Sequence, residues 1–230
     1  HTKIDELEKN DIQFKFKNRN YDQTATNITF EHTKSNSKKP RQIFYDNEIL
    51  GLLPVNENTY NLIWSMPNSF FDQVNKASSS TLLEYLSDRV SFVTGDIKKT
   101  NIHTSFPLSS RHASSYFRDN NLLIGDAAHK FHPLAGLGLN MGIEDVATLA
   151  NLLSKSNNLK GTLYDFTIKR MSRIQSLQQL LDLIVAFHSS DILSAELKLK
   201  ILNYFNKTNY LKPKIIENAT GLNNKDLISL

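Results

Sequence analysis

The chain has 230 residues, of which 40% are hydrophobic and 22% are charged, and this composition excludes a fully disordered protein. It contains no cysteine, which excludes disulfide frameworks, thiolate metal sites and cysteine nucleophiles. The net charge of +4 is only weak evidence for a nucleic-acid or membrane partner. No apolar run approaches the roughly 20 residues of a membrane span. Because the charged start also lacks the apolar segment of a signal peptide, we expect a cytoplasmic protein.

The first hundred residues favour short β-strands joined by polar turns. Apolar and polar residues alternate from Ile12 to Lys17, with the period of a half-buried strand. Further strands are expected at residues 24–30, 42–45, 49–55, 60–64 and 90–93, with polar turns at 46–47 and 56–58 and a short helix at 81–86. This spacing predicts an antiparallel meander.

Helical spacing dominates the second half of the chain. An apolar stripe is formed by Ile143, Val146, Ala147, Ala150 and Leu153. A longer helix is expected from Leu163 to about His188, with Thr162 as its N-cap. Another helix is expected at about residues 190–205.

Residues 121–145 combine several features of a ligand site. Leu122–Ile124 is a short apolar strand, and Gly125 allows a sharp turn and a close approach of the backbone. Asp126 then stands at the strand end, where α/β folds place ligands. Its carboxylate is suited to accept hydrogen bonds from a polyol.

A stiff loop and a helix N-terminus follow the aspartate. Pro133 stiffens the loop, and Gly136 and Gly138 bare backbone amides that can face a ligand. Asn140 is expected to cap a helix whose N-terminal amides stabilise an anion. This order of elements suits a large polar cofactor that becomes negative, such as a reduced flavin. An ordinary turn and an ordinary cap would explain each feature alone but not their succession.

The segment resembles the second flavin motif of the class A FAD-dependent aromatic monooxygenases. Within that group it is most similar to the ubiquinone-biosynthesis hydroxylases, which have Gly-Asp-Ala-Ala-His, then His-Pro, then Gly-x-Gly-x-Asn-x-Gly and an acid-rich helix. The chain has this pattern from Gly125 to Asp145, and weaker matches extend from about Tyr21 to Leu222. One departure is Leu137, where these hydroxylases usually carry Gln.

The resemblance implies a set of cofactor-binding residues. Asp126 would bind the ribityl chain of FAD, and Pro133 and the backbone after it would lie against the isoalloxazine. The helix after that loop would stabilise negative charge at the pyrimidine end of the flavin. The expected cofactor-binding residues are Gly125, Asp126, Pro133, Gly136, Leu137, Gly138, Leu139 and Asn140. No catalytic base and no metal site are expected.

The resemblance also implies the fold and its division. We expect an α+β chain, a fragment of an α/β FAD-binding fold, with an antiparallel substrate-domain sheet, the last flavin-motif strand and helix, and C-terminal helices. Residues 1–105 would bind substrate, 106–157 would complete the FAD-binding domain, and 158–230 would be helical. The family's Gly-x-Gly-x-x-Gly turn for the ADP part of FAD does not occur here. The chain is therefore expected to be the C-terminal part of a longer enzyme, inactive and a poor FAD binder alone.

The activity implied by the resemblance is hydroxylation of an aromatic ring, here a polyprenylated phenol in ubiquinone biosynthesis. FAD would be the cofactor, and NAD(P)H and O2 the co-substrates. Phe44, Leu53 and Trp64 are candidate contacts of the ring, although apolar strand residues are more often plain core. Partners would include a missing N-terminal half or other ubiquinone-biosynthesis proteins.

Peripheral contact with the inner membrane is a further expectation. Basic residues of the C-terminal helices could favour an anionic membrane surface, and the alternative is a solvated helix face. These residues are Lys169, Arg170, Arg173, Lys198 and Lys200.

Three other functions stay open. His129 and His132, near Asp126, could indicate a metal hydrolase, but no second compact ligand pair accompanies them. A non-catalytic remnant or partner-binding subunit would keep the fold without the activity. A flavin reductase of the same superfamily would share the Gly125-Asp126 motif but would not incorporate oxygen. Nucleic-acid binding is disfavoured, because basic residues and aromatic residues do not interleave in a stripe.

Overall fold

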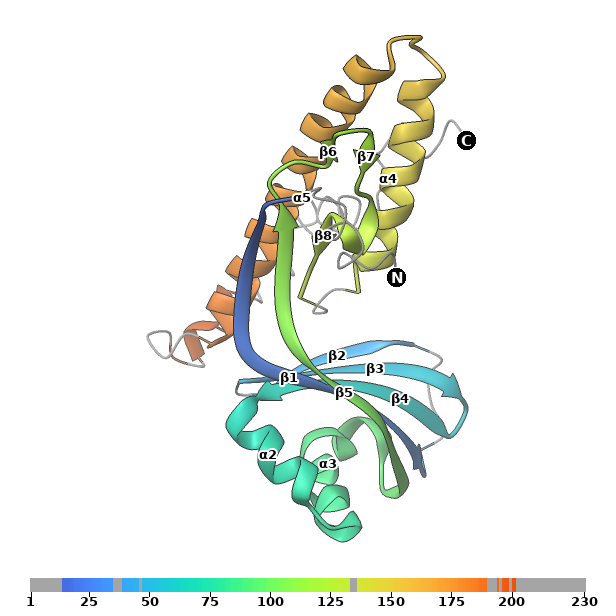
Figure 1. Cartoon of the computed structure of the whole chain (residues 1–230). Helices are drawn as coiled ribbons and strands as arrows, with labels where there is room; N and C mark the ends of the chain where they lie inside the picture. Colours follow the sequence, from blue (N-terminus) through green and yellow to red (C-terminus); the bar gives the residue numbers. More distant parts are fainter. Residues whose placement is uncertain are drawn as a thin grey trace. The chain divides into compact units, whose positions relative to one another are not determined.

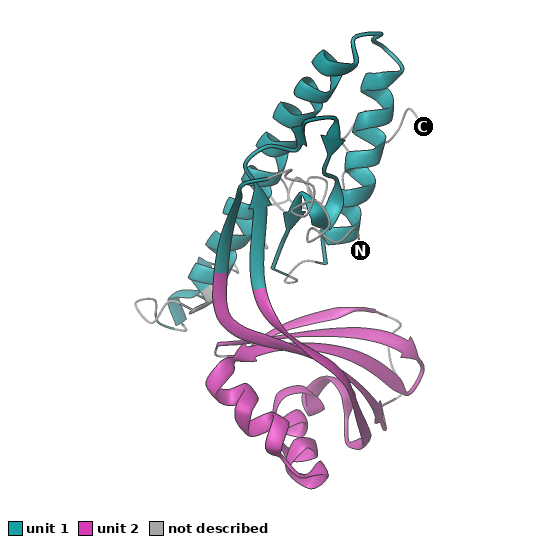
Figure 2. Ribbon diagram, viewed as in Figure 1, with its two compact units in different colours: residues 1–19, 109–230 teal, residues 20–108 magenta. Residues whose placement is uncertain are grey.

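The computed structural model describes residues 14–34, 39–45, 47–132 and 136–189, together with 194, 196–198, 200 and 201. Contacts divide the chain into two compact units, of which unit 2 is Asn20–Leu108 and unit 1 combines His1–Arg19 with Ser109–Leu230 (Figure 2). Antiparallel strands and helices are mixed in the chain, so the predicted α+β class is confirmed. The predicted helix at about 190–205, the strand start at Ile12 and Pro133 all fall wholly or partly outside the described residues.

Unit 2 is a curled antiparallel sheet with two helices on one face (Figure 1). Its elements are β1 (Phe16–His32, which starts in unit 1), β2 (Arg41–Tyr45), β3 (Glu48–Asn56), β4 (Thr59–Pro67), α2 (Asn68–Lys76), α3 (Ser79–Thr94) and β5 (Ile97–Ala113, which ends in unit 1). The strand order is β2-β3-β4-β1-β5-β8, where β8 (His129–Lys130) pairs with the end of β5. Strands β2, β3 and β4 form the predicted meander.

Alternation along the strands builds the core of unit 2. In β4 every second residue from Tyr60 to Met66 is buried, and these side chains pack against α2 and α3. The predicted strand at 90–93 is wrong, because those residues belong to α3. Val90 and Val93 continue the buried stripe of Leu82 and Leu86, so the helical period of the whole segment outweighs the β propensity of its valines.

Unit 1 contains two long helices, α4 (Gly138–Leu153) and α5 (Leu159–Ser189), which lie side by side (Figure 1). A hairpin of β6 (Phe117–Arg118) and β7 (Asn121–Leu122), a single 3₁₀ turn η1 (Gly125–Ala127) and β8 complete it. The core lies around Tyr116, Leu123 and Phe166. None of the helices within the described residues is long and apolar enough to cross a membrane.

The helices of unit 1 begin earlier than predicted. The predicted long helix lies within α5, but its N-cap is not Thr162, which is buried inside the helix. The Asn158 side chain accepts a hydrogen bond from the Gly161 N–H at 3.1 Å and caps this end. In α4 the buried face contains Met141, Glu144, Asp145, Ala147 and Thr148. The predicted apolar stripe is therefore only partly core, since Ile143 and Val146 are about half exposed.

Candidate functional site

The Gly125-Asp126 turn follows the short strand β7. Only Leu122 of the predicted strand 122–124 is in β7, while Leu123 is buried and Ile124 is extended. Gly125 has a φ of +56°, a value that favours glycine, and it opens η1. The turn places Asp126 at the surface next to the start of α4, where its Oδ1 would lie 3.6 Å from a Cβ built on Gly138.

No side chain of the described residues caps the N-terminus of α4. The N-cap position is Leu137, whose C=O accepts the Met141 N–H at 2.9 Å. Asn140 lies in the first turn, so the prediction that Asn140 caps the helix is wrong. The N–H groups of this first turn have no acceptor within the helix and carry partial positive charge. This end of the helix can therefore stabilise an anion.

A pocket of about 550 Å³ joins the turn to the first two turns of α4. Its lining residues are Gly125, Asp126, Gly138, Leu139, Gly142, Ile143, Val146 and Ala147. Glycines let the turn and α4 approach closely at this wall, since a Cβ on Gly142 would lie 3.6 Å from the Gly125 Cα. One acid and an uncapped helix end face an otherwise apolar wall, a combination typical of cofactor pockets.

The pocket brings together half of the predicted cofactor-binding residues. Gly125, Asp126, Gly138 and Leu139 line it. Gly136 and Asn140 are exposed nearby, and Leu137 is buried. Asp126 makes no hydrogen bond or ion pair with any residue that the structure describes, so both its carboxylate oxygens can accept from a ligand.

The predicted substrate residues lie on unit 2 and on both faces of its sheet. Phe44 pairs with Ile49 and shares a face with Leu53, and both Phe44 and Leu53 are exposed. Trp64 pairs with Leu50 on the opposite face and is fully buried. Its indole N–H donates to Glu48 at 2.7 Å. Trp64 therefore belongs to the core, the alternative that the sequence left open.

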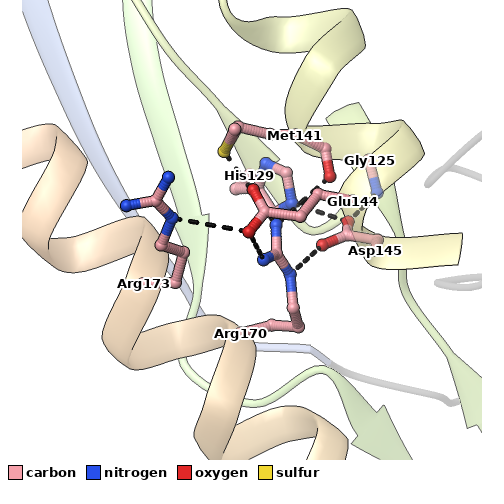
Figure 3. A network of polar contacts seen from close by, with 7 residues as sticks. All are labelled: Gly125, His129, Met141, Glu144, Asp145, Arg170 and Arg173. Atoms are coloured by element: carbon pink, nitrogen blue, oxygen red, sulfur yellow. Dashed lines mark hydrogen bonds and ion pairs between the residues drawn. The ribbon is translucent and has the colours of Figure 1, made fainter. Parts of the chain in front are cut away.

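A buried polar network holds the Gly125-Asp126 turn to both helices (Figure 3). Asp145 of α4 accepts from the Gly125 N–H at 2.7 Å, from His129 Nε2 at 2.8 Å and from Arg170 Nε at 2.6 Å. Glu144 accepts from Arg170 at 2.9 Å and contacts Arg173 at 3.5 Å. The side chains of His129, Glu144, Asp145 and Arg170 are at most 3% exposed.

The network keeps Asp145 ionised. Burial opposes the negative charge, but the hydrogen bonds of His129 and Gly125 and the charge of Arg170 outweigh it, so the pKa of the Asp145 carboxyl lies below its usual value. Burial also raises the pKa of the neighbouring Tyr116 hydroxyl. A fixed carboxylate thus stands directly behind the proposed ligand turn.

Sequence reasoning missed this network and misassigned Arg170. The side chain is buried and paired, so it is neither on a solvated face nor available to a membrane. Its spacing was the available signal, because Arg170 follows Phe166 by four residues and precedes Ile174 by four, on the buried stripe of α5.

His129 and His132 are both buried. Within the described ranges, no group of three or more His, Asp or Glu side chains is arranged to hold a metal ion. His129 instead donates to Asp145.

The family model that matches the chain is described as an FAD binding domain and covers residues 7–173. The chain belongs to this family. It is 32% identical over 171 residues to the ubiquinone biosynthesis monooxygenase COQ6 of Xenopus tropicalis, covering 60% of this chain and 37% of that protein. It is 29% identical over 150 residues to the 3-demethoxyubiquinol 3-hydroxylase of Escherichia coli, covering 61% of this chain and 37% of that protein. The predicted resemblance to the ubiquinone-biosynthesis hydroxylases is confirmed.

The fold also matches solved structures. The flavin-dependent brominase Bmp2 superposes with a TM-score of 0.68 at 12% identity, over 95% of this chain and 55% of that one. At this identity the likeness shows the fold alone. The chain spans little more than a third of the length of the two curated relatives named above.

The residues of the pocket fit FAD. Asp126 offers free acceptors for hydroxyl groups, and the uncapped end of α4 offers donors for an anionic edge. The three glycines leave the room that a Cβ would take.

Proposed function

We propose that the protein is an FAD-dependent monooxygenase that hydroxylates an aromatic ring of a polyprenylated phenol in ubiquinone biosynthesis, with NAD(P)H and O2 as co-substrates. The observation that carries this proposal is the pocket in which Asp126 meets the uncapped N-terminus of α4. The names of the relatives supply the substrate class. Because the chain spans only part of those relatives, the proposal concerns the whole protein.

The residues of the pocket have separate tasks. Asp126 accepts hydrogen bonds from the ribityl hydroxyls and so orients the cofactor. The first N–H groups of α4 stabilise negative charge at the flavin edge. Leu139, Ile143 and Val146 form an apolar wall that excludes water from this edge. The bound flavin itself supplies the electron transfer from NAD(P)H and the activation of O2.

The sheet of unit 2 offers the apolar surface for the substrate. Phe44 and Leu53 lie exposed on one face of it, although exposed apolar residues also occur without function. Their role in ring binding remains a proposal.

The test uses the full-length protein with a polyprenylated phenol, NAD(P)H and isotopically labelled O2. We expect FAD to copurify and one labelled oxygen atom to enter the ring. Asp126→Ala should lose most of the FAD and the hydroxylation. The matched control is Asp165→Ala, since Asp165 is an exposed acid on α5 outside the pocket, and it should retain both. NAD(P)H oxidation without label in the product would indicate a reductase, and absence of flavin would indicate a remnant.

A further inference from the structure

We propose that Asp145 is a positioning residue for the Gly125-Asp126 turn and that Arg170 fixes the Asp145 carboxylate. Helix α5, which carries Arg170, then contributes to the shape of the cofactor site. The inference rests on the proposed function, because it concerns how the site for FAD is held in shape. It does not place either residue in contact with the cofactor.

The position of the Asp126 carboxylate depends on the Gly125 N–H. Gly125 adopts a positive φ of +56°, and its N–H points at Asp145 Oδ2 at 2.7 Å. This bond fixes the plane of the Ile124–Gly125 peptide, so the chain enters the turn that carries Asp126 in one orientation. If the bond is lost, the turn can rotate, and the carboxylate then leaves the pocket.

The chemistry of the site requires a carboxylate at position 145. Oδ2 accepts from Gly125 and His129, while Oδ1 accepts from Arg170, so both oxygens face donors only. An asparagine would turn its NH2 group toward one of these donors and leave a buried donor without an acceptor. The arrangement therefore selects for an ionised side chain.

Arg170 holds the carboxylate by a second set of contacts. Its guanidinium binds Asp145, Glu144 and the Met141 carbonyl oxygen, all on α4. These contacts connect α5 to the turn through a single carboxylate. Arg173 of α5 contacts Glu144 at 3.5 Å.

Glu144 is the control for Asp145, because a residue with a purely structural role should affect stability but not the turn. It lies next to Asp145 on α4, is nearly as deeply buried and also binds Arg170, but the Gly125 N–H donates to Asp145. Glu144→Gln should therefore lower stability without loosening the turn. Asp145→Asn should do both.

The experiment measures two quantities in the full-length protein: the hydrogen-exchange rate of the Gly125 amide without flavin, and the dissociation constant for FAD. For Asp145→Asn we expect exchange at Gly125 about tenfold faster or more, and FAD affinity about tenfold weaker, as the loss of one hydrogen bond to a charged group implies. For Glu144→Gln both should stay within about twofold of the wild type. Equal effects of the two variants would overturn the proposal.

Arg170→Lys keeps the inference testable if Asp145→Asn does not fold. It preserves the charge next to Asp145 but loses the fork that binds two carboxylates at once. Exchange at Gly125 should then rise severalfold, and an unchanged rate would overturn the role of Arg170. If the wild type binds no FAD, the proposed function fails, while the exchange rates still decide whether Asp145 holds the turn.

Discussion

Gly125 and Gly142 face each other in the pocket, and an alanine should change stability in opposite directions at the two positions. At Gly125 a Cβ has room, with Gly142 Cα at 3.8 Å, but the φ of +56° is unfavourable for alanine. Gly125→Ala should therefore lower the free energy of unfolding by about 1 kcal/mol.

Gly142 is helical, so an alanine there should leave stability equal or raise it by about 0.5 kcal/mol. Its Cβ would occupy the pocket wall 3.6 Å from the Gly125 Cα, and FAD binding should weaken. Thermal unfolding and an FAD titration of both variants check this pair. A Gly142→Ala protein that binds FAD normally would contradict the assignment of the wall.

His132 should make the protein sensitive to acid. Burial lowers its pKa from 6.5 to about 4, with Asp182 of α5 opposing the shift and Arg19 adding to it. The unfolded chain then binds a proton that the folded chain does not, so stability is complete above pH 6.5 and falls as the pH drops to about 4. The loss should reach up to about 3 kcal/mol. Urea unfolding at several pH values should show that the free energy of unfolding depends more steeply on pH in the wild type than in His132→Gln. Parallel curves for the two proteins would contradict the prediction.

Individual site residues differ in how far the sequence could predict them. The turn at Gly125 and the exposed position of Asp126 were predictable because the glycine and the acid are consecutive in the chain. The cap at Asn140 was not, since the helix gains three residues and starts at Gly138, with Leu137 at the N-cap position. Asp145 and Arg170 are 25 residues apart and meet only in the fold. Charged residues on helices usually face solvent, and only their position on the buried stripe indicates otherwise.

Strand β3 and helix α3 are joined by an ion pair that should matter for stability. Glu48 accepts from Arg89 at 2.7 and 2.8 Å, and the two side chains are only 8% and 11% exposed. The guanidinium also lies within 6 Å of the rings of Tyr45, Trp64, Phe70 and Tyr85. The pair thus links the sheet to its covering helix.

Removing one partner of this pair should leave an uncompensated charge. Glu48→Gln is expected to lower the free energy of unfolding by about 3 kcal/mol, because Arg89 stays buried. The exposed Glu31→Gln on β1 serves as the control and should change it by less than about 0.5 kcal/mol. Chemical denaturation of both variants checks the difference; similar midpoints would mean that the pair contributes nothing.

At the level of elements, alternation in the strands was readable from the sequence, because each strand buries one face only. The segment 79–94 shows where such reading fails. Its valines favour a strand locally, but the segment forms a helix because helical spacing buries its apolar residues against the sheet. The exposed apolar residues of α4 show the same limit, since the pattern indicates an apolar face without saying what covers it.

The two units carry different parts of the proposed enzyme. Unit 1 holds the pocket, the buried network and both long helices, and unit 2 holds the sheet with Phe44 and Leu53 (Figure 2). The apolar wall of the pocket exposes Leu139, Ile143 and Val146. Adjoining exposed apolar residues beside a pocket are typical of a binding site, which agrees with the proposed cofactor between the Gly125-Asp126 turn and α4.

The most direct test of the account is native mass spectrometry of the protein isolated from its own source. The account predicts a protein that carries one FAD. A protein that carries no flavin would contradict it.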